Sequence, residues 1–185
     1  AIGLVGSEMC IRDRNRILQN PLHGLGVVLF NAQGILDLTN FDLTHVLYQL
    51  SIETSPNLHE IKYVFSSFLN QLQEHKKARQ ILKQIPKTHY LSNYATIQIS
   101  DSYGYQDDNA SAISNLINHS QNESNFEISL SLGNYYRYEK EWEKALSAYN
   151  NALIIGEEFN KKDLWEIYFN IGIVYERSDL SLIHI

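Results

Sequence analysis

The residue types that carry catalysis and bind metals occur in this chain, but their spacing fits none of the common catalytic motifs. The seven histidines are scattered, and no two lie three or four positions apart, as two ligands on one face of a helix would. His59-Glu60 is followed by Tyr63 where a zinc-protease helix needs its second histidine. The sequence has no glycine-rich phosphate loop and no Gly-X-Ser-X-Gly elbow. We therefore expect no catalytic residue, no metal, no cofactor, and a protein that is not an enzyme.

Cysteine and the acidic residues give no catalytic pattern either. Cys10 is the only cysteine, so it has no partner within the chain for a disulfide bond. The acidic clusters at 139–143 and 157–158 fall where helices are expected to end, and we interpret them as turn and linker charges. Any function must then come from noncovalent recognition, which depends on the elements that display the recognising side chains.

The composition favours a helical chain without a membrane span. Its 185 residues, 44% of them apolar, could form one moderate core or about five stacked units of roughly 34 residues. No apolar run approaches the ~18–20 residues that cross a bilayer. The formal charge of −6 argues against a nucleic-acid-binding face, which needs a concentrated basic stripe.

The segment 126–155 has the clearest pattern, which at helical spacing predicts two amphipathic helices joined by a polar turn at 139–141. Small residues recur where the two helices must touch, at Gly133 in the first helix and at Ala145 and Ala152 in the second. Large residues fill the space between these contacts: Leu132, Tyr136, Trp142, Leu146, Tyr149 and Leu153.

This pattern resembles a tetratricopeptide repeat (TPR), which has Leu-Gly at its seventh and eighth positions, Tyr at the eleventh, and small, aromatic and small residues at positions 20, 24 and 27. Glu157 departs from the family, which usually has proline there. The resemblance implies an all-α fold, a right-handed solenoid of stacked antiparallel helix pairs with about nine to ten helices and no sheet.

The same pattern predicts a TPR array over residues 15–177, with repeats starting near 25, 59, 93, 126 and 165. A small residue occupies the eighth position of every repeat: Ala32, Ser66, Ser100, Gly133 and Gly172. Pro86 should cut short the second helix of repeat two. Gly104 and His119 make repeat three the most divergent, and the fifth repeat lacks its second helix.

The two ends, 1–14 and 178–185, do not resemble the rest of the chain. The tracts LVGSEMCIRDR and SDLSLIHI are similar to translated sequencing-adapter DNA at the ends of fragmentary environmental reading frames. We therefore interpret the chain as a fragment and expect the first fourteen residues to add nothing to its stability. The uncovered apolar side of the fifth repeat should make the fragment self-associate.

The resemblance also implies where a ligand would bind, because the first helices of TPR arrays line a concave groove. The positions that face this groove in the family correspond here to Tyr63, Asn70, Tyr94, Asp101, Tyr105, Glu127, Asn134, Arg137, Tyr138, Phe169 and Asn170. Tyrosines with asparagines and mixed charges suit adaptable recognition of an extended peptide. The alternative is that several of them are ordinary surface residues, since tyrosine is abundant throughout the chain.

A more specific hypothesis, the clamp with which some family members hold a C-terminal carboxylate, does not match. Asn134 and Asn170 correspond to its two asparagines, but Leu130 replaces its first lysine and the third repeat that it needs is not in the chain.

The function that these observations favour is a non-enzymatic scaffold that binds a peptide or a partner helix in its concave groove. Two alternatives stay open: an accessory or regulatory domain of a larger enzyme, and a spacer that binds nothing. The resemblance is to long bacterial TPR proteins, which often open with a segment like Asn20–Gly24 and many of which are exported. We expect a soluble protein of the cytoplasm or the periplasm.

Overall fold

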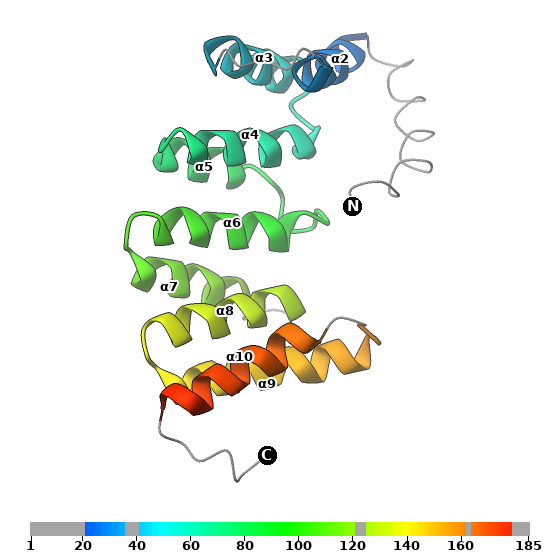
Figure 1. Ribbon diagram of the computed structural model, residues 1–185. Coiled ribbons are helices and arrows are strands. Elements are labelled where there is room, and N and C mark those ends of the chain that lie inside the picture. Colours follow the sequence, from blue (N-terminus) through cyan, green and yellow to red (C-terminus); the bar gives the residue numbers. More distant parts are fainter. Residues whose placement is uncertain (1–20, 36–40, 121–124, 162–163, 179–185) are drawn as a thin grey trace. The chain divides into compact units, whose positions relative to one another are not determined.

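The computed structural model describes residues 21–35, 41–120, 125–161 and 164–178, which form nine α-helices and no strand (Figure 1). In order they are α2 (Pro21–Ile35), α3 (Phe41–Thr54), α4 (His59–Gln71), α5 (His75–Leu82), α6 (Ser92–Gly104), α7 (Asn109–Ser120), α8 (Phe126–Tyr138), α9 (Trp142–Glu158) and α10 (Trp165–Arg177). The all-α prediction is confirmed. The predictions about residues 1–14 and about the C-terminal tail lie outside the described residues.

The chain divides into two compact units, residues 1–68 and residues 69–185, with the boundary inside α4. In the first unit α2 begins at Pro21, a position that suits proline because the first helical N–H has no partner in the helix. Tyr48 of α3 is buried and stacks on Phe65 of α4, with 5.0 Å between ring centroids. Gly26 lies so close to the end of α3 that a Cβ there would be 2.3 Å from the Ser55 hydroxyl oxygen. Aromatic stacking and a close helix contact hold this unit together.

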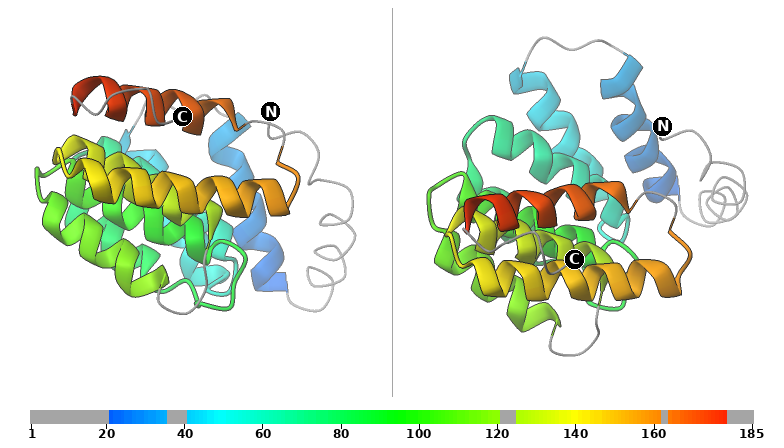
Figure 2. Two further views of the ribbon diagram at one scale, coloured as in Figure 1. Left: turned by 90° about the horizontal axis from the view of Figure 1, so that it is seen from below. Right: turned by 60° about the horizontal axis from the view of Figure 1, so that its bottom comes forward.

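In the second unit the helices pair as α6 with α7 and α8 with α9, and α10 packs alongside α9 (Figures 1 and 2). Its core joins the inner face of α9 to the inner face of α10, through the buried side chains of Ala145, Tyr149, Ala152, Ile167, Ile171 and Val174. Leu153 of α9 and Tyr175 of α10 pack against this core. The first helices α6, α8 and α10 are neighbours along one side of this unit.

The same turn follows four of the helices and is closed by backbone hydrogen bonds. Gln73, Asp107, Lys140 and Asn160 all have positive φ, which places one left-handed residue just after α4, α6, α8 and α9. The next N–H donates to the carbonyl five residues back, as from Glu141 to Tyr136 at 2.9 Å, and this is the Schellman motif. Along the chain the first three turns recur after 34 and 33 residues, which is the period of the sequence pattern.

The close helix contact expected between Gly133 and the helix that follows it is present. A Cβ on Gly133 would lie 2.4 Å from the Tyr149 ring, so only glycine allows α8 and α9 to approach this closely. Ala145 is fully buried, as predicted. Gly172 holds the corresponding place on α10, but a Cβ there would meet no described atom within 4 Å, so that side of α10 is open.

The structure also accommodates the three residues that depart from the repeat pattern, Pro86, Gly104 and His119. The helix α5 ends at Leu82, before Pro86, and is only 8 residues long. Gly104 is the last residue of α6, and His119 is accommodated at its small-residue position by polar partners, with its Nδ1 3.0 Å from Thr96 Oγ1 and its Nε2 2.7 Å from Asn93 Oδ1. No helix within the described residues is both long and apolar enough to cross a bilayer.

Candidate cleft over α6, α8 and α10

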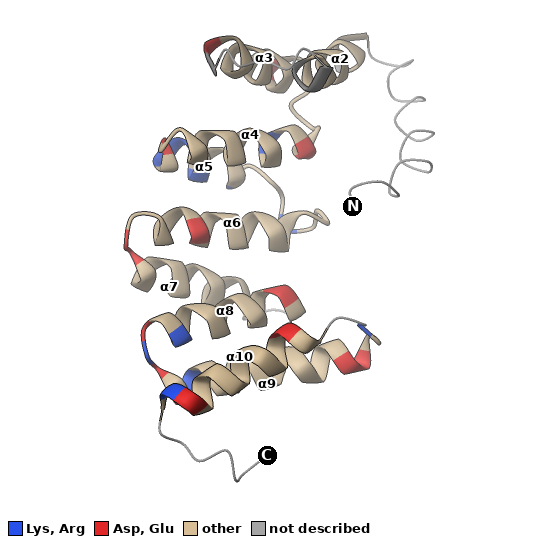
Figure 3. Cartoon of the chain, viewed as in Figure 1, with Lys and Arg blue, Asp and Glu red and all other residues tan. Residues whose placement is uncertain are grey.

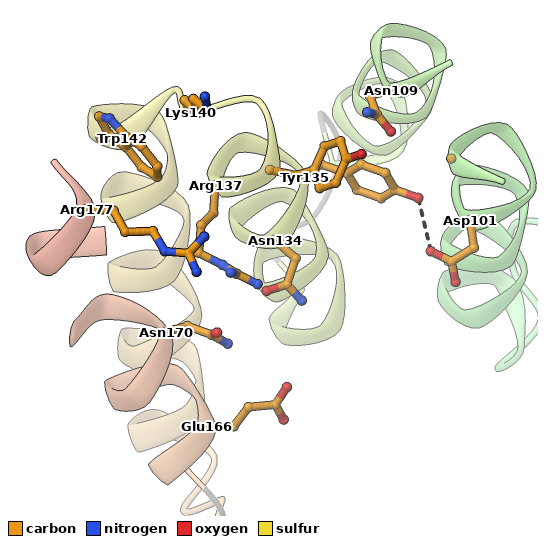
Figure 4. A pocket seen from close by; sticks show the side chains of 12 residues that line it. Asp101, Asn109, Asn134, Tyr135, Arg137, Lys140, Trp142, Glu166, Asn170 and Arg177 are labelled. Carbon is orange, nitrogen blue, oxygen red and sulfur yellow. Dashed lines mark hydrogen bonds between the residues drawn. The ribbon is translucent and has the colours of Figure 1, made fainter. Parts of the chain in front are cut away.

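A cleft of about 1200 Å³ lies within the second unit, over the three first helices α6, α8 and α10 (Figure 4). The first residues of α7 and α9 and the turn between α8 and α9 complete its wall. The lining residues are Asp101, Gly104, Asn109, Asn134, Tyr135, Arg137, Tyr138, Lys140, Trp142, Glu166, Asn170 and Arg177.

A hydrogen-bonded chain fixes the middle of the cleft to the core. Tyr149 of α9 is buried, and its hydroxyl donates to Asn134 Oδ1 at 2.8 Å while it accepts from Arg137 Nε at 3.1 Å. Burial raises the pKa of the Tyr149 hydroxyl, and the Arg137 bond opposes that rise, so the hydroxyl stays a donor at neutral pH. The buried Tyr149 therefore fixes the positions of Asn134 and Arg137 in the cleft.

A second pair closes the cleft on the α6 side. The Tyr135 hydroxyl donates to Asp101 Oδ1 at 3.1 Å (Figure 4). A Cβ on Gly104 would lie 2.8 Å from the Tyr135 hydroxyl oxygen, so glycine at the end of α6 leaves room for this contact. Burial raises the pKa of the Asp101 carboxyl, and the Tyr135 bond partly offsets the rise. Burial and the nearby Asp101 also raise the pKa of Tyr135 well above its usual range.

Asn170 of α10 is a buried polar residue that lines the cleft without a partner. Its side chain is only 7% exposed, and it makes no hydrogen bond to any described residue. Figure 4 shows its amide on the cleft side of α10. The amide is not one of the buried side-chain groups that lack a partner, so it reaches solvent from the cleft and is open to a hydrogen-bonding ligand.

The charged side chains of the cleft are unevenly distributed. Arg137 and Arg177 belong to the last turns of α8 and α10, and Lys140 follows α8 (Figure 3). Glu166 is in the first turn of α10, and Asp101 is bonded to Tyr135. The cleft lining thus contains three cationic and two acidic side chains, although the whole chain has a formal charge of −6.

Five of the eleven predicted groove residues line this cleft: Asp101, Asn134, Arg137, Tyr138 and Asn170. They come from three helices that are separated in sequence, and the structure brings them to one surface.

The other six predicted groove residues do not line the cleft. Two of them are exposed on their helices, Tyr94 on α6 and Phe169 on α10. Two more contact His75: Asn70 Oδ1 is 3.1 Å from its Nδ1, and the exposed Tyr105 ring is tilted against it. Glu127 is paired with Lys161 at 2.5 Å, and Tyr63 is half-buried in the first unit.

Several lining residues were missed because they are not at groove positions of the first helix. Lys140 and Asn109 lie in or just after the turns, and Trp142 begins α9. Arg177, in contrast, ends α10 at the position that Tyr138 holds in α8, so the repeat pattern could have identified it. Among the described residues no group of three His, Cys, Asp or Glu side chains is placed to hold a metal ion.

Comparison with known proteins shows the fold. The chain matches no protein-family profile, and no curated protein sequence matches it. Among solved structures it is similar to MamA, at 20% identity with a TM-score of 0.62, covering 86% of this chain and 84% of MamA. It is similar to BtubC (BKLC) from P. vanneervenii at 14% identity and a TM-score of 0.68, covering 90% and 79%.

A third solved structure of similar fold is YrrB, described as a TPR protein with an unusual peptide-binding site. The identity is 13% and the TM-score 0.57, covering 91% of this chain and 84% of YrrB. These likenesses, together with the helix pairs described above, show that the chain has the TPR fold.

Proposed function

We propose that this chain is a protein-interaction scaffold that binds an extended peptide segment of a partner protein in the cleft over α6, α8 and α10. The observation that carries the proposal is the convergence of Asp101, Asn134, Arg137, Tyr138 and Asn170 on one cleft of about 1200 Å³. The TPR fold supports it, because stacked repeats present a continuous surface built from one helix of each repeat.

The chemistry of the lining suits a peptide. The amides of Asn134 and Asn170 can both donate and accept, as the N–H and C=O groups of a peptide backbone require. Tyr138 and Trp142 offer large flat surfaces with one polar group each, and such residues bind with little loss of conformational entropy. YrrB, which shares the fold, is described as having a peptide-binding site, and this supports the same use of the fold here.

Selection from a random peptide library displayed on phage tests the proposal. Selected peptides should bind the chain in fluorescence anisotropy, and Tyr138→Ala should weaken them about tenfold, since exposed aromatic side chains commonly dominate such interfaces. Tyr138 is 70% exposed, so its removal should leave the fold intact.

Asn150→Ala is the matched control, because Asn150 is an exposed residue of α9 that does not line the cleft. The proposal is wrong if selected peptides bind the Tyr138→Ala and Asn150→Ala variants equally well, or if none is selected.

A further inference from the structure

Three cations gather at one end of the cleft without carboxylate partners. Arg137, Lys140 and Arg177 line the cleft, and none of them has a described Asp or Glu oxygen within 4.0 Å. Three other lysines of the second unit are paired, Lys77 with Glu74, Lys144 with Glu141, and Lys161 with Glu127, whereas the exposed Lys76, Lys83 and Lys87 lie outside the cleft without a described carboxylate partner. In a chain with 21 acidic and 15 basic residues, three unpaired cations on one surface form a local excess of positive charge.

The arrangement is held before any ligand binds. Arg137 donates through Nε to the buried Tyr149 hydroxyl, which leaves its two terminal nitrogens for other acceptors. Asn134 accepts from the same hydroxyl through Oδ1, which leaves its NH₂ group as a donor. Groups that are ordered in advance lose less entropy on binding than mobile ones do.

Asn170 adds a polar group to the same surface. This side chain is more than nine-tenths buried, lines the cleft and has no described hydrogen-bond partner. Its amide reaches solvent from the cleft, so it can donate to and accept from a ligand there.

Helix electrostatics explain only part of this arrangement. Cations in the last turn of a helix interact favourably with its dipole, which accounts for Arg137 in α8 and Arg177 in α10. That effect explains neither why both line one cleft with Lys140 nor why Asn170 beside them lacks a partner.

We infer that the peptide bound in this cleft carries acidic side chains, which Arg137, Lys140 and Arg177 bind, while Asn134 and Asn170 bond its backbone. The inference rests on the proposed function and adds the chemistry of the partner. Three cations outnumber a single terminal carboxylate, so the geometry points to Asp and Glu side chains. Glu166, at the opposite end of α10 from Arg177, disfavours a second acidic group there and so gives the bound segment a direction.

The test is the composition of peptides selected from the random library on the full chain. Because the chain is acidic overall, nonspecific attraction would enrich basic peptides. We expect enrichment in Asp and Glu instead. The double variant Lys140→Glu/Arg177→Glu should weaken the selected peptides about tenfold or more, and the loss should shrink at high salt.

Lys76→Glu/Lys87→Glu is the matched control, since both lysines are exposed, lie outside the cleft and undergo the same change of charge. This control should leave binding unchanged within about twofold. An equal loss in both double variants would overturn the inference, because it would show a general charge effect.

Two further outcomes separate the inference from the proposed function. Selected peptides that lose binding to Tyr138→Ala but carry no acidic excess would overturn the inference and leave the proposed function standing. Peptides that lose binding when their C-terminus is amidated would also overturn it, because the anion would then be a terminal carboxylate. Peptides indifferent to Tyr138→Ala would overturn both.

Discussion

Tyr149 lies where the core of the second unit meets the cleft. Its ring fills the space left by Gly133, and its hydroxyl joins Asn134 to Arg137. The packing of the core and the positions of two cleft side chains therefore depend on the same residue. Asp101 of α6 and Tyr135 of α8 form a second polar pair that joins these two helices, and burial makes the Asp101 carboxyl harder to ionise.

The raised pKa of Asp101 predicts a pH dependence of stability. Above its ordinary pKa of 3.8 and below the raised pKa, the folded chain holds a proton that the unfolded chain has lost. The free energy of unfolding should therefore fall as the pH rises through that interval. Asp101→Asn removes the titrating carboxyl but keeps an acceptor for the Tyr135 hydroxyl. The free energy of unfolding of this variant should therefore fall less over the same pH interval than that of the original chain. Urea denaturation at a series of pH values measures this, and parallel profiles for the two proteins would contradict it.

The left-handed turn residues predict a stabilising substitution. A non-glycine residue in this conformation costs about 1–2 kcal/mol, and glycine costs about 0.5–1 kcal/mol of chain entropy. Gln73→Gly, at φ 62°, should therefore stabilise the chain by about 0.5–1 kcal/mol. Gln71→Gly, within α4, should destabilise it by a similar amount. Chemical denaturation compares the two, and the opposite order would be evidence against the turn geometry.

The sequence predicted single residues best where the repeat pattern determines their position. The burial of Ala145 and the close contact at Gly133 follow from small residues at fixed places. The cleft was predicted only in part. Lys140 is not at a groove position, and the position of Tyr135 depends on room left by Gly104 in another repeat. Glu127 was predicted to face the groove, but Lys161 of the linker pairs with it, a contact that the pattern does not encode.

At the scale of the elements, helix pairs are joined by one kind of turn and packed through small residues. The period of 34 and 33 residues between turns keeps α6 and α8 in equivalent positions, which is what brings their side chains to one cleft. The lengths of the helices were predictable where a breaker is present, as for α5 before Pro86. The place of α10 at the cleft was predicted in part, through Asn170, and the packing of Ile167, Ile171 and Val174 against α9 holds the helix there.

Two glycines at equivalent positions should respond in opposite ways to the same substitution. Gly133→Ala places a methyl 2.4 Å from the buried Tyr149 ring, and it should destabilise the chain by about 1–3 kcal/mol. Gly172→Ala meets nothing within 4 Å inside α10, and it should stabilise the chain by about 0.5–1 kcal/mol. Thermal or urea unfolding measures both changes. Equal effects would mean that α8 and α9 do not approach as described.

At the scale of the whole molecule, the exposed aromatic residues of α10 predict self-association. Trp165 and Phe169 are 69% and 62% exposed, and the nearby Gly172 is uncovered. Light scattering should show species larger than 21.4 kDa as the concentration rises. Trp165→Gln/Phe169→Gln should reduce them, whereas Tyr90→Gln, which removes an exposed aromatic residue elsewhere, should not. A chain that stays monomeric at all concentrations would contradict this prediction.

The central claim is that a peptide binds in the cleft, and NMR titration of the ¹⁵N-labelled chain with a selected peptide tests it most directly. The side-chain amide signals of Asn134 and Asn170 should shift and saturate together, because both line the cleft and have free hydrogen-bonding groups. Signals from exposed residues outside the cleft, such as Lys76 and Asn150, should stay in place. Shifts confined to those residues, with Asn134 and Asn170 unmoved, would show that the peptide binds elsewhere.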